Sequence, residues 1–137
     1  KRDIRYCQSF IRNYPESEYI DEMEKDIQKM RNKLAKKKKK NGLLYRKMNK
    51  WESAVIYFDE MLNNYYDTKW VLESKLEKAY CLIRMRKFGE YKQVVASIKD
   101  NNQIDNELKA ELTHLQDEYN DEQNQIVKEQ EKRKGRF

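Results

Sequence analysis

The sequence predicts an all-α fold, and two observations carry that prediction. Large apolar residues recur every three or four positions through most of the 137 residues, which is the spacing of one helix face. Only three Gly and one Pro are present to interrupt this pattern. The 39% of charged residues and the mean hydropathy of -1.20 are typical of disorder, but aromatic residues at regular intervals make up 12% of the chain. The helices are therefore expected to pack around a core.

The stretch over residues 42–68 predicts how the helices pack. Its small residues let two helices approach closely, and its aromatic residues fill the space beside them. These positions are Gly42, Tyr45, Trp51, Ala54 and Phe58. The spacing is typical of a tetratricopeptide repeat, a helical hairpin of about 34 residues. Ala79 stands to Phe88 as Gly42 stands to Trp51, so a second hairpin is expected 37 residues later.

The chain is expected to form a repeat region over residues 1–100, followed by a C-terminal helix and basic tail over residues 101–137. Pro15 disfavours the helical conformation of Tyr14 and ends the first helix. Nothing breaks a helix between Tyr19 and Met48, because Gly42 costs only about 1 kcal/mol relative to Ala in a helix interior. The repeat region then comprises a partial repeat over 1–16, one long shared helix over 19–48, and hairpins over 42–64 and 68–99. This is a tetratricopeptide-type helical-repeat solenoid.

Three helix starts carry local signals. Asn49 followed by Glu52 has the pattern of a capping box, which predicts a helix start near Lys50. Asp67 or Thr68 is expected to cap the first helix of the second hairpin. A last helix is marked by Ile104, Leu108, Leu112, Leu115 and Tyr119. The residues after it are expected to form either a free helical extension or an arm that orders on a partner.

Five consecutive lysines, Lys36 to Lys40, interrupt the apolar stripe of the long helix. One interpretation is a solvated stretch, in which long stems cover apolar surface and the charged heads stay in water. The other is a basic ring that contacts lipid phosphates or an acidic partner. The sequence leaves both open.

Composition and motifs argue against several classes of function. The net charge of +6 is compatible with nucleic acid, anionic lipid or an acidic protein as partner, but no motif that reads nucleic acid is present. The sequence has no Gly-rich phosphate loop, nucleophile elbow or metal-ligand cluster, so neither an enzyme activity nor a cofactor is expected. Cys7 and Cys81 fall on apolar helix faces, where buried thiols are favoured over a disulfide or a reactive role.

The concave face of such a solenoid is lined by the first helix of each hairpin. The residues expected there are Leu43, Arg46, Lys47, Leu76, Tyr80, Ile83 and Arg84. Apolar and basic groups together suit an extended peptide with a terminal carboxylate. The alternative is that Leu76 and Ile83 belong to the core and that the basic heads are solvated.

Four short motifs in the chain resemble those of one protein family. In that family they typically read as a YPxSxY turn, a long helix through LRNxLA, a YYxKRxxYxAA segment and a YPDT turn. The matching residues are Tyr14, Pro15, Ser17, Tyr19, Leu34, Ala35, Tyr45, Lys47, Trp51, Ala54, Tyr65, Asp67 and Thr68. Over about residues 5–85 the chain is similar to the carboxyl-terminal part of the BamD family, the tetratricopeptide lipoproteins of the outer-membrane β-barrel assembly machine. Lys40, Met48 and Tyr66 depart from the pattern, and Tyr57 stands where the family often has arginine.

The resemblance implies a non-enzymatic scaffold on the periplasmic face of the bacterial outer membrane, held by a lipidated cysteine that lies outside this chain. In that family the carboxyl-terminal repeats dock on the barrel protein BamA, and the amino-terminal repeats take up unfolded barrel-protein sequences. The implied partners are a BamA-like protein, other lipoproteins of the machine and barrel-protein peptides. Solvent-facing residues of the 42–68 hairpin would carry the docking surface. The candidate partner-binding residues are Arg46, Lys47, Tyr57, Tyr80 and Arg84.

Two other classes of function stay open on the sequence. A generic peptide-binding tetratricopeptide module predicts that no lipoprotein signal lies upstream of Lys1. A basic helical binder of nucleic acid or of a membrane surface predicts an affinity that collapses at moderate salt.

Overall fold

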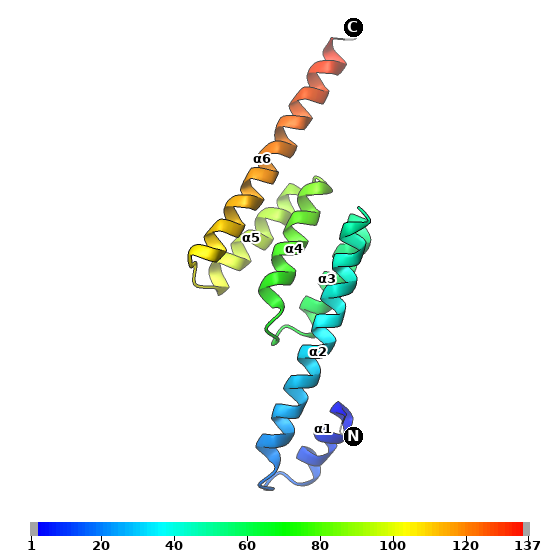
Figure 1. The fold of residues 1–137 in the computed structure, drawn as a ribbon, viewed down its shortest axis with the longest axis vertical. Helices are drawn as coiled ribbons and strands as arrows, with labels where there is room; N and C mark the ends of the chain where they lie inside the picture. Colours follow the sequence, from blue (N-terminus) through cyan, green and yellow to red (C-terminus); the bar gives the residue numbers. More distant parts are fainter. Residues whose placement is uncertain (1–2, 136–137) are drawn as a thin grey trace.

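The computed structural model describes residues 3–135, and all regular secondary structure in this range is helical. The elements are α1 (Ile4–Asn13), α2 (Ile20–Lys47), α3 (Trp51–Asn64), α4 (Val71–Arg84), α5 (Phe88–Asn101) and α6 (Asn106–Lys134). The predicted all-α class is therefore confirmed. Figure 1 shows α1 and the end of α6 at opposite ends of the molecule.

The helices lie in two layers. In Figure 1, α2, α4 and α6 form the nearer layer, and α3 and α5 lie behind them. Helix α3 packs against both α2 and α4, and α5 packs against α4. The first part of α2 contacts α1, whereas its second part contacts α3 (Figure 1). One long helix is thus shared between two packing units, and the alternation of front and back helices is that of a tetratricopeptide-like solenoid.

The first hairpin closes around Gly42 of α2. A Cβ atom at this position would lie 2.6 Å from Cε1 of Phe58 on α3. Phe58 and Ala54 are fully buried and form a core cluster with Cys81 of α4. The absence of a side chain at Gly42 is therefore what lets α2 and α3 reach this separation.

A second core cluster joins α4, α5 and α6. It contains Ala79, Leu82, Ile83, Tyr91 and Leu115. Tyr119 of α6 stacks on Tyr91 with ring centroids 5.2 Å apart and meets the Phe88 ring edge-on at 5.3 Å. The apolar packing of α6 on this cluster extends to Tyr119, and the helix continues to Lys134.

The start of α6 differs from the prediction. Ile104 was expected on the last helix, but it precedes the helix and is 48% exposed. The reason is Asp105, whose carboxylate accepts a hydrogen bond from the Leu108 N–H at 2.8 Å and caps the helix.

Helices α2 and α4 end in the same way, 37 residues apart. Asn49 and Arg86 follow them with positive φ angles of 58° and 59°. At both ends the N–H of this residue and that of the next bond back to carbonyls three and five residues earlier, at 2.9 or 3.0 Å. This pattern is a Schellman motif. The capping box predicted at Asn49 was wrong, because Asn49 ends α2 and no side chain caps α3.

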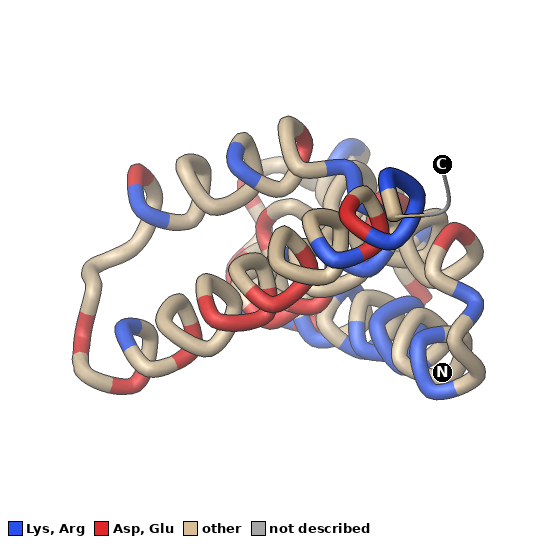
Figure 2. The backbone as a smooth tube through the Cα atoms, turned by 90° about the horizontal axis from the view of Figure 1, so that it is seen from above, with Lys and Arg blue, Asp and Glu red and all other residues tan. Residues whose placement is uncertain are grey.

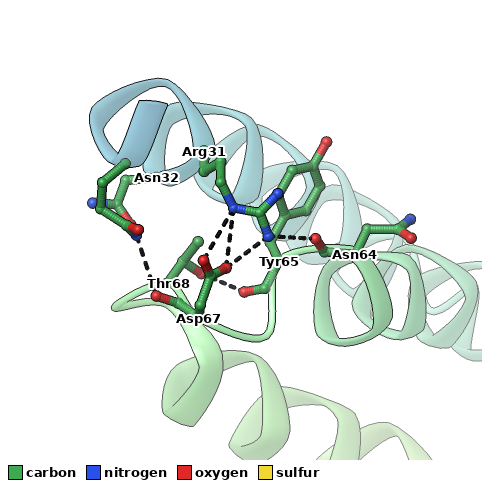
Figure 3. A network of polar contacts seen from close by, with 7 residues as sticks. Arg31, Asn32, Asn64, Tyr65, Asp67 and Thr68 are labelled. Atoms are coloured by element: carbon green, nitrogen blue, oxygen red, sulfur yellow. Dashed lines mark hydrogen bonds and ion pairs between the residues drawn. The ribbon is translucent and has the colours of Figure 1, made fainter. Parts of the chain in front are cut away.

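The turn between α3 and α4 is held by Arg31 of α2 (Figure 3). Its Nη2 donates to Asp67 Oδ1 at 2.6 Å and to the Asn64 carbonyl at 2.7 Å. The Thr68 hydroxyl donates to the Tyr65 carbonyl at 2.8 Å. Neither Asp67 nor Thr68 caps α4, so that prediction was wrong. Asp67 instead ties the turn to a helix more than 30 residues earlier in the chain.

Candidate functional site

Three of the candidate residues meet where α2, α3 and α4 come together. The Arg46 guanidinium lies 4.1 Å from the Tyr80 ring centroid. Tyr80 in turn meets the Trp51 ring edge-on at 5.9 Å, and the Arg84 guanidinium lies 5.7 Å from the Trp51 centroid. The arrangement is a mixed stack of cations and rings, in which each charge faces an aromatic surface.

The charges of this stack already have acidic partners within the chain. Arg46 Nε lies 3.0 Å from Glu77 Oε2, although these two atoms do not form a hydrogen bond. Arg84 Nη1 lies 3.3 Å from Glu122 Oε2 of α6. The two arginines expected to meet a peptide carboxylate therefore face internal carboxylates. Neither arginine offers an uncompensated charge to such a peptide.

Tyr57 and Lys47 lie apart from this stack. Tyr57 of α3 stacks on Tyr45 of α2 with ring centroids 5.3 Å apart and planes inclined by 12°, and Lys38 Nζ lies 5.8 Å from its centroid. Lys47, the last residue of α2, is exposed and makes no ion pair within residues 3–135. The same end of α2 exposes Leu44 and Met48, by 56% and 51%.

The apolar residues expected on the concave face divide between core and surface. Ile83 is fully buried in the second core cluster, which confirms for this residue the alternative that it belongs to the core and is not presented to a peptide. It points inward because α6 packs over α4 and covers that side of the helix. Leu76 is half-buried and lines a groove.

The run from Lys36 to Lys40 is neither a fully solvated stretch nor a complete basic ring. Lys39 forms an ion pair with Glu73 and lies 4.6 Å from the Trp70 centroid, and Lys38 Nζ lies 2.9 Å from Glu60 Oε2. Lys37 and Lys40 are exposed. Two of the five charges thus fasten α2 to α3 and α4, so a complete basic ring is not presented.

The sequence reasoning missed a groove between α2, α4 and α6, with a volume of about 420 Å³. Its apolar lining comes from all three helices and comprises Leu43, Leu72, Leu76 and Leu108. Its polar lining comprises Glu73, Glu77, Asp105, Glu107 and Glu111 together with Gln103 and Lys39. The concave side is therefore acidic at this end, whereas a basic surface was expected.

The electrostatics of the groove centre on Glu77. Burial raises the pKa of its carboxyl, while Arg46 and Lys39 oppose that rise. Two like charges raise the same pKa further: Glu111 of α6 from across the groove, and Glu73 from one turn earlier on α4. The carboxylates of α4 and α6 therefore act on one another across the groove, although they lie over 30 residues apart in the sequence.

A local signal for this groove does exist in the sequence. Leu72 and Leu76 are spaced by four residues, and so are Glu73 and Glu77 directly after them. The same doublets recur on α6 as Leu108 with Leu112 and Glu107 with Glu111. A spacing of four places each pair on one helix face. The facing of the two helices, however, depends on tertiary packing.

Cys7 and Cys81 are fully buried and are not joined by a disulfide, which confirms the expected burial of both thiols. Burial raises the pKa of the Cys81 thiol to about 12. No group of three His, Cys, Asp or Glu side chains within the described residues could hold a metal ion. In the same range, no helix is both long enough and apolar enough to cross a membrane.

A comparison with models of protein families identifies the family of the chain. The model of the family YfiO, described as an outer membrane lipoprotein, matches residues 2–96. No curated protein matches the chain. The match spans more than half of the residues, and the chain belongs to this BamD-like family of outer membrane lipoproteins. The narrower assignment to the carboxyl-terminal part of BamD stays a prediction.

Proposed function

We propose that this member of the YfiO family is a non-enzymatic scaffold subunit of the outer-membrane β-barrel assembly machinery, docking on a BamA-like barrel protein through its helical repeats. The family match over residues 2–96 carries the proposal, since it covers α1 to α4 and most of α5. An outer membrane lipoprotein built from stacked helical hairpins has broad side-chain surfaces on both layers and suits a role in binding proteins.

The end of α2 supports a docking surface. Leu44 and Met48 lie one turn apart and are both more than half exposed, and Lys47 stands beside them. Exposed apolar residues with a neighbouring charge are typical of protein interfaces. Of the candidate cations, Arg46 and Arg84 face internal carboxylates, so Lys47 is the one we assign to the barrel protein. Tyr57, stacked on Tyr45, is proposed to extend the same surface on α3.

The periplasmic location belongs to the same proposal. A lipidated cysteine outside this chain would hold the protein to the inner leaflet of the outer membrane. Other lipoproteins of the machinery and unfolded barrel-protein peptides are proposed as further partners.

Co-purification of the tagged full-length protein from detergent-solubilised outer membranes tests this function. We expect the wild-type protein to fractionate with the outer membrane and to retain a BamA-like barrel protein. Lys47→Glu should reduce the retained barrel protein by roughly fivefold, because it places a negative charge at the docking surface. Lys37→Glu is the matched control, since it reverses an exposed lysine of the same helix outside that surface.

Two results would contradict the proposal. One is a full-length protein that fractionates away from the outer membrane and retains peptides without a barrel protein, which would favour the generic peptide-binding module. The other is an equal loss of barrel protein in both variants, which would remove Lys47 from the docking surface.

A further inference from the structure

The groove between α2, α4 and α6 has the features of a protein-docking surface rather than of a small-molecule site. It is lined by leucine side chains from three helices and by the polar and charged side chains named above. Leu108 is nearly buried, whereas Leu43, Leu72 and Leu76 remain half-buried and reachable from the groove. Apolar floors with polar rims are typical of grooves that accept one face of a partner segment.

The rim of the groove carries an excess of negative charge. Glu73 is paired with Lys39, Glu77 with Arg46, and Asp105 caps α6. Glu107 and Glu111 are exposed and make no ion pair within residues 3–135. This acidic rim stands out in a chain with a net charge of +6. In Figure 2 the acidic segments follow the first part of α6, and the basic ones lie near its C-terminal end.

The spacing of the carboxylates indicates what kind of cation would fit. They do not gather into a group that could hold a metal ion in the described part of the chain. Glu73 with Glu77 and Glu107 with Glu111 each lie one helical turn apart on helices that face the groove. The Glu73 and Glu77 row is already paired within the chain, so the unpaired Glu107 and Glu111 row is the one that matches lysine or arginine residues one turn apart on a partner helix.

We infer that this groove binds a helical segment of a partner protein, with leucine-like side chains on one face and lysine or arginine along the adjoining edge. The apolar face would lie on the four leucines, and the basic edge would meet the Glu107 and Glu111 row. The inference goes beyond the proposed docking on a barrel protein and does not need it, because Leu44, Lys47 and Met48 are not among the residues that line the groove.

Titration calorimetry with the 137-residue chain and a synthetic probe tests the inference. The probe is a helical peptide of about 14 residues, with leucine on one face and lysine on the other. A second peptide carries glutamate in place of every lysine. We expect the lysine peptide to bind with a dissociation constant on the order of 10 μM and the glutamate peptide not to bind.

Two double variants locate the binding. Glu107→Gln with Glu111→Gln removes the unpaired row and should weaken the lysine peptide by about tenfold. Asp117→Asn with Asp121→Asn removes two exposed carboxylates from the same helix outside the groove lining, and should change the affinity less than about twofold. Circular dichroism of both variants checks that the helices are retained.

Several outcomes would overturn the inference. They are equal binding of the two peptides, equal weakening by the two double variants, or no binding of the lysine peptide. Analytical sedimentation of the chain without peptide tests whether a second copy of the chain occupies the groove instead. We expect a monomer, whereas self-association abolished by the Glu107 and Glu111 variant would show that the basic end of α6 from a second copy occupies the groove. A failure here would leave co-purification with a barrel protein unaffected.

Discussion

The two hairpins repeat one backbone arrangement with different side chains at the facing positions. In the first, Gly42 lies against the fully buried Phe58 ring. In the second, 37 residues later, the equivalent residues are Ala79 and Val95, and Val95 packs against the cluster that contains Ala79. The second hairpin thus has the larger residue of the two at the first position, Ala in place of Gly, and the smaller one at the facing position, Val in place of Phe. The comparison teaches that the pair together, rather than either residue, fits the space between the helices.

The ends of the hairpins differ in a related way. Asn49 and Arg86 both adopt the left-handed conformation, which Asn tolerates better than Arg does. The Arg86 side chain, however, binds α6: its Nε donates to Glu122 Oε1 at 2.8 Å and its Nη1 to Glu129 Oε2 at 2.9 Å. The second hairpin therefore uses the same backbone turn to hold the next helix.

The largest expected effect comes from breaking the size match of the first hairpin. Gly42→Ala would place a Cβ atom within 3 Å of the Phe58 ring and should lower the free energy of unfolding by about 1–3 kcal/mol. The gain in helix propensity of about 1 kcal/mol offsets only part of this loss. Urea denaturation measures the difference. An unchanged midpoint would show that the Phe58 ring can move aside at no cost.

Converting the first pair into the second sharpens the comparison. Phe58→Val in the Gly42→Ala background gives the Ala and Val combination of the second hairpin. The smaller ring-free side chain removes the clash, so the two substitutions should couple favourably by about 1 kcal/mol in a double-mutant cycle. Additive losses would argue that the two hairpins are packed differently.

The turn after the first hairpin gives a smaller, pH-dependent effect. The hydrogen bonds from Arg31 hold the pKa of Asp67 below its ordinary value. Its contribution is therefore complete above the unfolded pKa of about 4 and is lost as the pH falls through the lower folded pKa. Because both side chains are partly exposed, Asp67→Asn should cost only about 0.5–1 kcal/mol at pH 7.

The matched control lies in the second turn, where Ile104 occupies the position equivalent to Asp67. Ile104→Asn should leave the pH dependence of stability as it is in the wild type. Thermal unfolding between pH 7 and pH 3 follows both variants. A stability difference for Asp67→Asn that stays constant over this range would contradict the assigned ion pair.

The ion pairs of Arg86 with Glu122 and Glu129, which clamp α6 to the end of α4, predict a local effect on hydrogen exchange. Arg86→Asn keeps a residue suited to the left-handed conformation but removes the contacts with Glu122 and Glu129. Amide hydrogen exchange in residues 120–134 should accelerate several-fold, while exchange in α4 stays unchanged. Asn49→Gln is the matched change at the other turn and should not alter exchange in α6. Equal acceleration in both variants would count against the clamp.

The smallest expected effect comes from Gly89 of α5. A Cβ atom there would have no neighbour within 4 Å, so Gly89→Ala should stabilise the protein by a few tenths of a kcal/mol. Measured beside Gly42→Ala, it separates the effect of helix propensity from that of close packing. A loss of stability would show that α5 needs the glycine for another reason.

Much of the fold could be predicted from the sequence because apolar spacing is a local property. It indicated the long helix through Gly42 and the offset of 37 residues between the hairpins. The helix ends were harder, since Asn49 suits both a helix start and a left-handed helix end. Asp67 was assigned to a local cap because its partner, Arg31, lies on a distant part of the chain.

The candidate site was less predictable, because charge partners are set by tertiary packing. The sequence indicates that Arg46 and Arg84 lie on helices, but not that Glu77 and Glu122 face them. For the same reason the acidic groove was missed, although each of its glutamate doublets is visible in the sequence. Lys47 and Tyr57 stay predictions for the docking surface.

The most direct test of the central claim is depletion of the full-length protein in its own cells, followed by measurement of folded barrel proteins in the outer membrane. A scaffold of the assembly machinery predicts that their amount falls as the protein is lost, and that the wild-type protein restores it. Unchanged amounts of folded barrel proteins after depletion would contradict the proposed function.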